Sequence, residues 1–347
     1  MNLDPILHVP LGDAVTYIRN MLKARLVPMI HGSPAIGKSA IMHVIAKELN
    51  LYLIDARFAG FDPTDLQGFP AIDHEAGVSK YYPMETFPLD DWTIPEGYSG
   101  WLVFCDELTS APPAVQVASY KLFLDHEVGQ RKLHPQVYLA GAGNLESDGA
   151  VVNPMSTALI SRLGHLVVKE DFEFFMKWAD KGGLSPLMCS WLRYMPASFY
   201  TFDPDQPDQP YASPRTLEFT HQYLQQVGGD PRQSLIPMAG FINLKPAQDL
   251  ITFANVWSQL PKREDVMNHP TTAHCPGYDN PGALHALCGA VGAWLEVDTI
   301  TKLMPYVARI EPDFQAVTLR NAVRRKPELM DTPEIQKWIQ GNASILL

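Results

Sequence analysis

The stretch His31-Gly32-Ser33-Pro34-Ala35-Ile36-Gly37-Lys38-Ser39 decides the fold of this chain. From Gly32 to Ser39 it fits the pattern G-x-x-x-x-G-K-[ST] of a phosphate-binding loop. An apolar run at 26–30 precedes the pattern, and a segment with the apolar spacing of a helix follows it. The alternative is an ordinary Gly/Pro turn before a helix, but such a turn does not require a strand in front of it, whereas a phosphate loop does. The sequence therefore predicts a strand, a phosphate loop and a helix in this order.

Each part of the loop has an expected task. Glycine adopts backbone angles that other residues avoid, so successive N–H groups can turn toward phosphate oxygens. The helix that begins near Lys38 adds the positive end of its dipole. Lys38 is expected to reach the β- and γ-phosphates, and the Ser39 hydroxyl to bind Mg²⁺. The residues expected to contact the nucleotide are Gly32, Ser33, Pro34, Ala35, Ile36, Gly37, Lys38, Ser39 and Ala40.

A second apolar run ends in two acidic residues. The run 101–105 is apolar at every position, which is typical of a central parallel strand, and Asp106 and Glu107 follow it. Open α/β sheets bind ligands at the carboxyl ends of their strands. We therefore expect Asp106 to hold Mg²⁺ and Glu107 to act as general base toward the attacking water. Taken alone, the two acids could instead cap the following helix.

A third apolar run, 137–143, ends at Asn144. Its amide is expected to hydrogen-bond the γ-phosphate or the lytic water, although an asparagine can also simply begin a turn. The alternation of strands and helices predicts a doubly wound parallel sheet. The other predicted elements of this part are helices at 11–24, 38–49, 114–124 and 156–162 and strands at 26–31, 51–56 and 166–168. A long Gly-, Pro- and Asp-rich region before Gly100 is compatible with a short hairpin near 74–77.

After about residue 170 the pattern becomes helical. A low-complexity loop at 203–210 is followed by Ser213-Pro214-Arg215, which predicts a helix with Ser213 as its N-cap. Three domains are predicted on this basis. They are an α/β nucleotide-binding domain over 1–170, an α-helical lid over 171–265 and a helical C-terminal extension over 266–347.

Composition limits the classes of function. The 347 residues are 46% hydrophobic and 19% charged, with a net charge of −11, which argues against broad binding to nucleic acid or an anionic membrane. The four cysteines have no CxxC spacing, so a zinc site at His274, Cys275 and Cys288 is not expected. No signal peptide is evident, and the nearly apolar run 283–295 is too short to span a bilayer. A cytoplasmic location is therefore predicted.

The order of these motifs resembles that of AAA+ ATPases, and specifically of the MoxR group in the helix-2-insert clade. The matching segments, which span most of 10–220, are the phosphate loop, Asp65-Leu66-Gln67-Gly68, Phe104-Cys105-Asp106-Glu107, the hairpin-like 124–134, Gly143-Asn144, Ser161-Arg162-Leu163 and Ser213-Pro214-Arg215. The chain departs from the group in having Ser-Pro-Ala-Ile at 33–36 in place of Pro-Pro-Gly-Thr. It also has Ser161-Arg162-Leu163 where Asp-Arg-Phe is common.

The resemblance implies a role for each matching residue. Lys38, Ser39, Asp106 and Glu107 correspond to the Walker residues, and Asn144 corresponds to sensor 1. Arg162 resembles the arginine finger, which acts on the γ-phosphate of a neighbouring subunit, and Arg215 resembles sensor 2. The helical segments at 240–257 and beyond 280 are similar to the extension of bacterial and phage-encoded relatives.

The resemblance also implies an activity. It predicts a P-loop NTPase of AAA+ fold that binds ATP and Mg²⁺ and forms a homo-oligomeric ring, which is expected to be hexameric. The ring would hydrolyse ATP to remodel a protein partner. The partner in this group is often a protein with a von Willebrand factor A domain, and the location would be the host cytoplasm if the chain is viral. Two alternatives remain open: a nucleic-acid-directed AAA+ protein such as a helicase loader, and a scaffold that holds nucleotide without turnover.

Overall fold

The computed structural model describes residues 8–75, 77–149 and 152–342. The chain divides into two compact units. The first is formed by the chain up to Asp171 together with Asp203–Pro207, and the second by Phe172–Phe202 and everything from Asp208 onward. The change to a helical pattern near residue 170 therefore coincides with the end of the first compact unit.

A six-stranded sheet forms the centre of the first unit, in the order β1-β10-β2-β9-β6-β3, and every neighbouring pair is parallel. Its strands are β1 (His8–Pro10), β2 (Pro28–His31), β3 (Tyr52–Arg57), β6 (Trp101–Asp106), β9 (Val137–Gly143) and β10 (Gly164–Lys169). The phosphate loop follows β2, which lies between β10 and β9. This arrangement, followed by a helical second unit, confirms the predicted fold class. The edge strand β1 is an addition that was not predicted.

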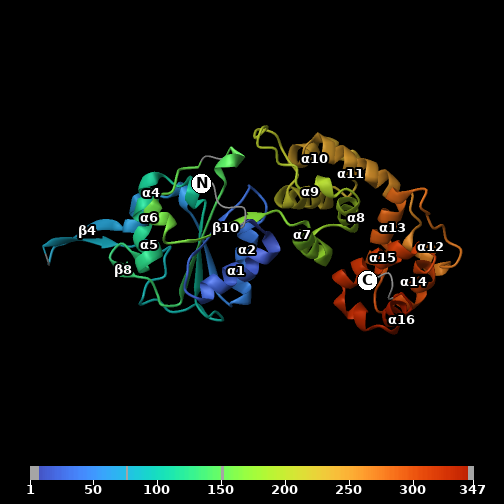
Figure 1. The fold of residues 1–347 in the computed structure, drawn as a ribbon, viewed down its shortest axis with the longest axis horizontal. Helices are drawn as coiled ribbons and strands as arrows, with labels where there is room; N and C mark the ends of the chain where they lie inside the picture. Colours follow the sequence, from blue (N-terminus) through green and yellow to red (C-terminus); the bar gives the residue numbers. More distant parts are fainter. Residues whose placement is uncertain (1–7, 76, 150–151, 343–347) are drawn as a thin grey trace. The chain divides into compact units, whose positions relative to one another are not determined.

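Helices cover both faces of this sheet. In Figure 1, α1 (Leu11–Lys23) and α2 (Lys38–Glu48) lie on one side, and α4 (Pro113–Ala118), α5 (Tyr120–Asp125) and α6 (Thr157–Ile160) lie on the other. Strand β6 is buried on both faces, because Trp101, Val103 and Cys105 join the core beneath α4 and α5 while Leu102 and Phe104 are buried between them in the sequence. Two-sided burial explains why its apolar run is uninterrupted.

The helix predicted at 114–124 is two helices, α4 and α5, which meet at Ser119. The Ser119 hydroxyl donates to the carbonyl oxygen of Gln116 at 2.7 Å. A serine that hydrogen-bonds to a nearby carbonyl competes with the regular helical pattern, and this accounts for the break.

The long region between β3 and β6 has structure of its own. It contains α3 (Pro63–Gln67). The N-terminus of this helix is stabilised by reciprocal side-chain-to-backbone hydrogen bonds between Asp62 and Asp65. It also contains an antiparallel hairpin of β4 (Phe69–Asp73) and β5 (Val78–Tyr82), which extends away from the rest of the unit in Figure 1. Part of the hairpin predicted near 74–77, residue 76, lies outside the described residues. A second hairpin, β7 (Glu127–Val128) and β8 (Arg131–Lys132), occupies the hairpin-like segment 124–134.

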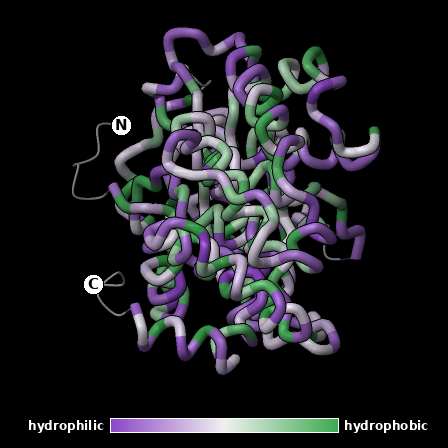
Figure 2. The backbone as a smooth tube through the Cα atoms, turned by 90° about the vertical axis from the view of Figure 1, so that its right-hand side faces the viewer, coloured by the Kyte–Doolittle hydropathy of each residue, from purple (hydrophilic) through white to green (hydrophobic). Residues whose placement is uncertain are grey.

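The second unit is built from helices. They are α7 (Phe172–Trp178), α8 (Pro186–Tyr194), α9 (Pro214–Gln226), α10 (Leu235–Ile242), α11 (Leu244–Trp257), α12 (Arg263–Asn268), α13 (Pro281–Trp294), α14 (Ile300–Val307), α15 (Pro312–Arg325) and α16 (Pro333–Gly341). Helix α9 begins as predicted, with the Ser213 hydroxyl accepting from the Thr216 N–H at 3.3 Å. In Figure 2 hydrophobic and hydrophilic residues are interspersed along the chain, and amphipathic helices require such a mixture.

Two apolar clusters stabilise the second unit. One packs around Trp191, Leu217 and Leu250, and the other around Leu287, Leu303 and Leu319. Helix α13 supplies Ala286 to the first cluster and Leu287 to the second. Helix α13 therefore contributes to both clusters. Among the described helices, none combines the length and apolar character needed to cross a membrane.

Candidate nucleotide-binding site

The segment after β2 has the backbone of a tight cradle. Gly37 has φ +108°, which glycine adopts readily, and it directly precedes α2. A Cβ at Gly32 would lie 2.8 Å from the carbonyl oxygen of Val168, so only glycine fits there. Ala35 also has a positive φ, +59°, although it is not a glycine. The loop therefore depends on backbone angles that most residues avoid.

The Lys38 side chain bends back and contacts the backbone of this loop. Its Nζ donates to the carbonyl oxygens of Gly32, at 2.7 Å, and Ser33, at 2.9 Å. It also donates to Oδ1 of Asn144 at 2.8 Å, so the residue expected to act as sensor lies next to the loop lysine. Strand pairing explains the contact, because β9 and β2 are neighbours and Asn144 follows β9 directly.

Ser39, the residue after the loop lysine, contacts Asp106 at the end of β6. The Ser39 hydroxyl donates to Oδ2 of Asp106 at 3.0 Å, and Oδ1 of Asp106 accepts from the Glu107 N–H at 2.8 Å. Glu107 has φ +57° and ψ +28°, an uncommon conformation for a residue with a side chain. Its half-buried carboxylate has no hydrogen-bond or ion-pair partner in the described parts of the chain, so it is available to a water or ligand.

Thr109 holds Asn144 in place, a role that the sequence did not reveal. Its Oγ1 accepts from the Asn144 N–H at 3.1 Å and lies 3.4 Å from the Asn144 carbonyl oxygen. A Cβ at Gly143 would lie 2.3 Å from this Oγ1, so Gly143 makes room for the contact. The Gly before Asn144 is the one sequence signal of a close approach here, but it does not identify the approaching residue.

The arginines that resemble the arginine finger and sensor 2 lie just after α6 and in α9. Arg162 is half-buried and donates to the Ala158 carbonyl at the end of α6, with its guanidinium 5.4 Å from the centre of the Tyr120 ring. No hydrogen bond or ion pair joins it to Lys38 or Asp106 among the described residues. Arg215 is exposed at the second position of α9, in the second compact unit.

Two further titratable residues flank the loop. His31, the last residue of β2, is buried, and burial, followed by the charges of His165 and Lys38, lowers its pKa to about 3. Its Nε2 lies 2.9 Å from Nδ1 of His165, so His31 is neutral and paired near neutral pH. Burial raises the pKa of Asp148, whereas Ser33, Ser147 and the charge of Lys38 act in the opposite direction.

The donors present fit a nucleotide and a magnesium ion. The cradle at Gly32 and Gly37 leaves room at the point where phosphate oxygens approach backbone N–H groups, and α2 adds its N-terminus. The converging hydroxyl of Ser39 and carboxylate of Asp106 are hard oxygen donors of the kind Mg²⁺ prefers. The described residues hold no cluster of three His, Cys, Asp or Glu side chains, so phosphate and water would have to complete the coordination.

The sheet order and the loop geometry define an α/β protein of the phosphate-loop class with a helical second unit. No protein-family model matches the sequence, and no curated protein matches it as a relative. The chain has distant structural likenesses. A protein of Cytophaga hutchinsonii named as a candidate ATPase is 13% identical, with 98% of this chain and 90% of that chain covered and a TM-score of 0.37.

Two other solved structures are similarly distant. NtrX of Brucella abortus in complex with ADP is 14% identical over 100% of this chain and 70% of that chain, with a TM-score of 0.39. A RuvB variant of Thermotoga maritima is 18% identical over 86% of this chain and 85% of that chain, with a TM-score of 0.33.

Proposed function

We propose that this chain binds ATP together with Mg²⁺ and hydrolyses the terminal phosphate bond. The observation that carries the proposal is the meeting of four residues from distant parts of the chain. Lys38 contacts Asn144 at 2.8 Å, and Ser39 contacts Asp106 at 3.0 Å, at the carboxyl ends of β2, β9 and β6. Open α/β sheets bind their ligands at this edge.

Each residue of the site has a separate role in the proposed reaction. The backbone N–H groups of the loop and the Lys38 ammonium bind the phosphates, and Ser39 and Asp106 hold the metal ion. A bound Mg²⁺ neutralises charge on the phosphates during phosphoryl transfer. Glu107, whose carboxylate has no partner among the described residues, accepts a proton from the attacking water. Asn144 orients the water or the terminal phosphate.

We further propose an AAA+ ring of MoxR type that remodels a protein partner in the cytoplasm, such as a protein with a von Willebrand factor A domain. The motif order in the sequence supports this assignment, and a hexameric ring would bring Arg162 to a neighbouring site. The net charge of −11 favours a protein partner over nucleic acid. Stimulation of the ATPase by DNA, lost at raised salt concentration, would instead support a helicase-loader type of function.

Lys38→Ala tests the binding site. We expect it to abolish ATP binding measured by calorimetry, because it removes the positive charge that faces the phosphates. Lys47→Ala is the matched control, since Lys47 is an exposed lysine in the last turn of the same helix, and it should bind ATP normally. Normal ATP affinity in Lys38→Ala would exclude the phosphate-loop assignment.

Glu107→Gln separates hydrolysis from binding. We expect the variant to bind ATP but to turn it over about 10²- to 10⁴-fold more slowly, the usual contribution of a general base. Phosphate release and calorimetry on the same preparation measure the two quantities. Turnover within a few-fold of the wild type would show that Glu107 is not the base, and absence of turnover in the wild-type protein under all conditions would favour a nucleotide-binding scaffold.

A further inference from the structure

Asp148 is a buried acid beside the phosphate loop with no task in the proposed reaction. It ends the short 3₁₀ turn Glu146–Asp148, four residues after Asn144, and only 7% of its surface is exposed. Its Oδ2 has no hydrogen-bond partner among the described residues, and Oδ1 is 3.4 Å from the Ser147 hydroxyl. A buried carboxylate with an unsatisfied oxygen is unfavourable, so its presence here calls for a physical explanation.

The surroundings of Asp148 belong to the phosphate loop. The Ser33 hydroxyl and the Lys38 charge both favour the ionised form of Asp148, against the effect of its burial. Lys38 is in turn hydrogen-bonded to Asn144, at the start of the segment that carries Asp148. The Asp148 carboxyl group is therefore close enough to Ser33 and Lys38 to interact with both, and Lys38 is the residue expected to bind the terminal phosphates.

We propose that Asp148 is an internal anion of the phosphate loop, which competes with the terminal phosphate of ATP for Lys38 and Ser33. This inference rests on the proposed function. With no nucleotide, the carboxylate partly balances the charge of Lys38. When ATP enters, its terminal phosphate brings negative charge to the same groups, and Asp148 has to move away or take up a proton.

The competition should discriminate between nucleotides. Electrostatic repulsion falls with distance, so the group closest to Lys38 and Asn144 experiences most of it. ADP lacks the terminal phosphate and carries one negative charge less. Removal of the Asp148 charge should therefore strengthen ATP binding more than ADP binding.

Asp148→Asn tests the proposal, because asparagine keeps the shape and removes the charge. Calorimetry with ATP and with ADP at pH 7.5 measures both affinities in the full chain. We expect ATP to bind on the order of tenfold more tightly than to the wild type, with a smaller gain for ADP. Glu146→Gln is the matched control. It removes one charge from the exposed start of the same turn and should leave the ratio of the two affinities unchanged.

A pH series adds a readout that a merely structural role would not affect. Because burial raises the pKa of Asp148, wild-type ATP affinity should approach that of Asp148→Asn as the pH falls and the carboxylate takes up its proton. The charged group opposing this uptake is Lys38. Asp148→Ala should reproduce the gain in ATP affinity, which guards against a new hydrogen bond formed by asparagine.

The outcomes separate this inference from the function on which it rests. Weaker ATP binding in Asp148→Asn, or an unchanged ratio of ATP to ADP affinity with a wild type that binds both, overturns the role of Asp148 alone. Failure of the wild type and both Asp148 variants to bind either nucleotide overturns the proposed function, and this inference with it.

Discussion

At the scale of single residues, the candidate site contains two non-glycine residues with left-handed backbone. Ala35 and Glu107 both have positive φ angles, +59° and +57°, although neither is a glycine. Left-handed backbone is unfavourable by roughly 1–2 kcal/mol for a residue with a Cβ, and such strain is characteristic of functional sites.

Ala35→Gly should relieve that strain. We expect the substitution to stabilise the protein by about 1 kcal/mol, after allowance for the greater freedom of glycine in the unfolded chain. Urea unfolding in the absence of nucleotide measures the change. Ala40→Gly makes the same chemical change at an exposed helical position of α2 and should destabilise by up to about 1 kcal/mol. A loss of stability in both variants would show that Ala35 is not strained.

A site residue could be predicted where its sequence pattern is contiguous, and could not be predicted where its role depends on residues far away in the chain. The loop residues were predictable because their pattern is contiguous, and Asp106 and Asn144 because each ends an apolar run. Thr109 and Asp148 were not, because their neighbours Asn144 and Lys38 are 35 and 110 positions away in the sequence, and the pairing of β6, β9 and β2 brings them together. The conformation of Glu107 has no sequence signal, since glutamate rarely adopts it.

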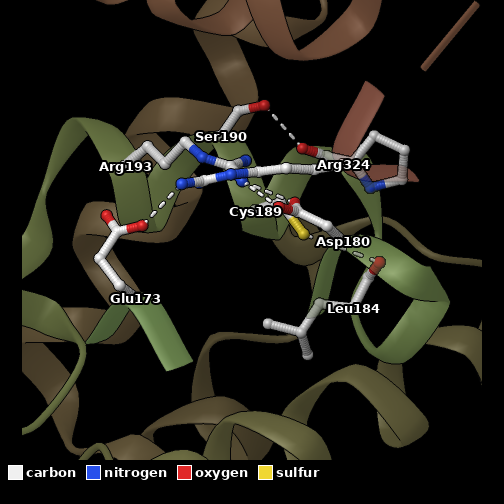
Figure 3. A network of polar contacts seen from close by, with 8 residues as sticks. Glu173, Asp180, Leu184, Cys189, Ser190, Arg193 and Arg324 are labelled. Atoms are coloured by element: carbon white, nitrogen blue, oxygen red, sulfur yellow. Dashed lines mark hydrogen bonds and ion pairs between the residues drawn. The ribbon is translucent and has the colours of Figure 1, made fainter. Parts of the chain in front are cut away.

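At the scale of elements, a buried ion pair joins α8 to the turn that precedes it at the start of the helical unit. Figure 3 shows the Arg193 side chain from α8 directed at Asp180, with Arg324 from α15 close by and paired with Glu173 from α7. The Arg193–Asp180 distances are 2.6 and 2.5 Å, and the Asp180 side chain is 1% exposed. The Arg324–Glu173 pair, at 2.8 Å, has side chains that are 29% and 62% exposed.

The two pairs should therefore contribute differently to stability. Arg193→Ala leaves a buried carboxylate without its partner, and we expect a loss of about 3–5 kcal/mol in the free energy of unfolding. Arg324→Ala breaks the exposed pair on the same cluster and should lose less than about 1 kcal/mol. Chemical denaturation followed by tryptophan fluorescence compares them. Equal losses in the two variants would mean that the burial of Asp180 does not determine the effect.

Elements with a strong internal pattern were predictable, and those that depend on distant partners were not. Strands β6 and β9 were located by their apolar runs. Strand β1 has three residues and exists through its pairing with β10, about 160 positions later in the chain, so no local pattern indicates it. The break between α4 and α5 depends on the hydrogen bond from the Ser119 hydroxyl to the Gln116 carbonyl oxygen, and the sequence does not show which acceptor a serine will use.

At the scale of the whole molecule, helix α13 contributes to both apolar clusters of the helical unit. The predicted boundary at 265 falls inside α12 (Arg263–Asn268), and α13, which follows it, supplies Ala286 to the cluster that contains Leu250 of α11. No local pattern indicates this contribution, because Leu250 and Ala286 are 36 positions apart in the sequence. The division of the chain into domains at 1–170, 171–265 and 266–347 stays a prediction.

Arg162 connects the single chain with the proposed ring. Its Nε is buried without a hydrogen-bond partner among the described residues, while another nitrogen of the guanidinium donates to the Ala158 carbonyl. A guanidinium that only stabilised the end of α6 would contribute under about 1 kcal/mol. One that neutralises charge at a neighbour's γ-phosphate would change the rate by about 10³- to 10⁵-fold.

Mixed rings distinguish these two roles. Rings of Arg162→Ala and rings of Glu107→Gln should each be nearly inactive. When the two are mixed, some interfaces join a subunit with Glu107 to a neighbour with Arg162, and these should hydrolyse ATP. Arg25→Ala is the matched control, because Arg25 likewise packs on an aromatic ring, Tyr138, and donates to a carbonyl, that of Val137. Rings of this variant alone should remain active. If sedimentation shows that mixed rings form and they stay inactive, or if Arg162→Ala alone is fully active, Arg162 does not act in a neighbouring site.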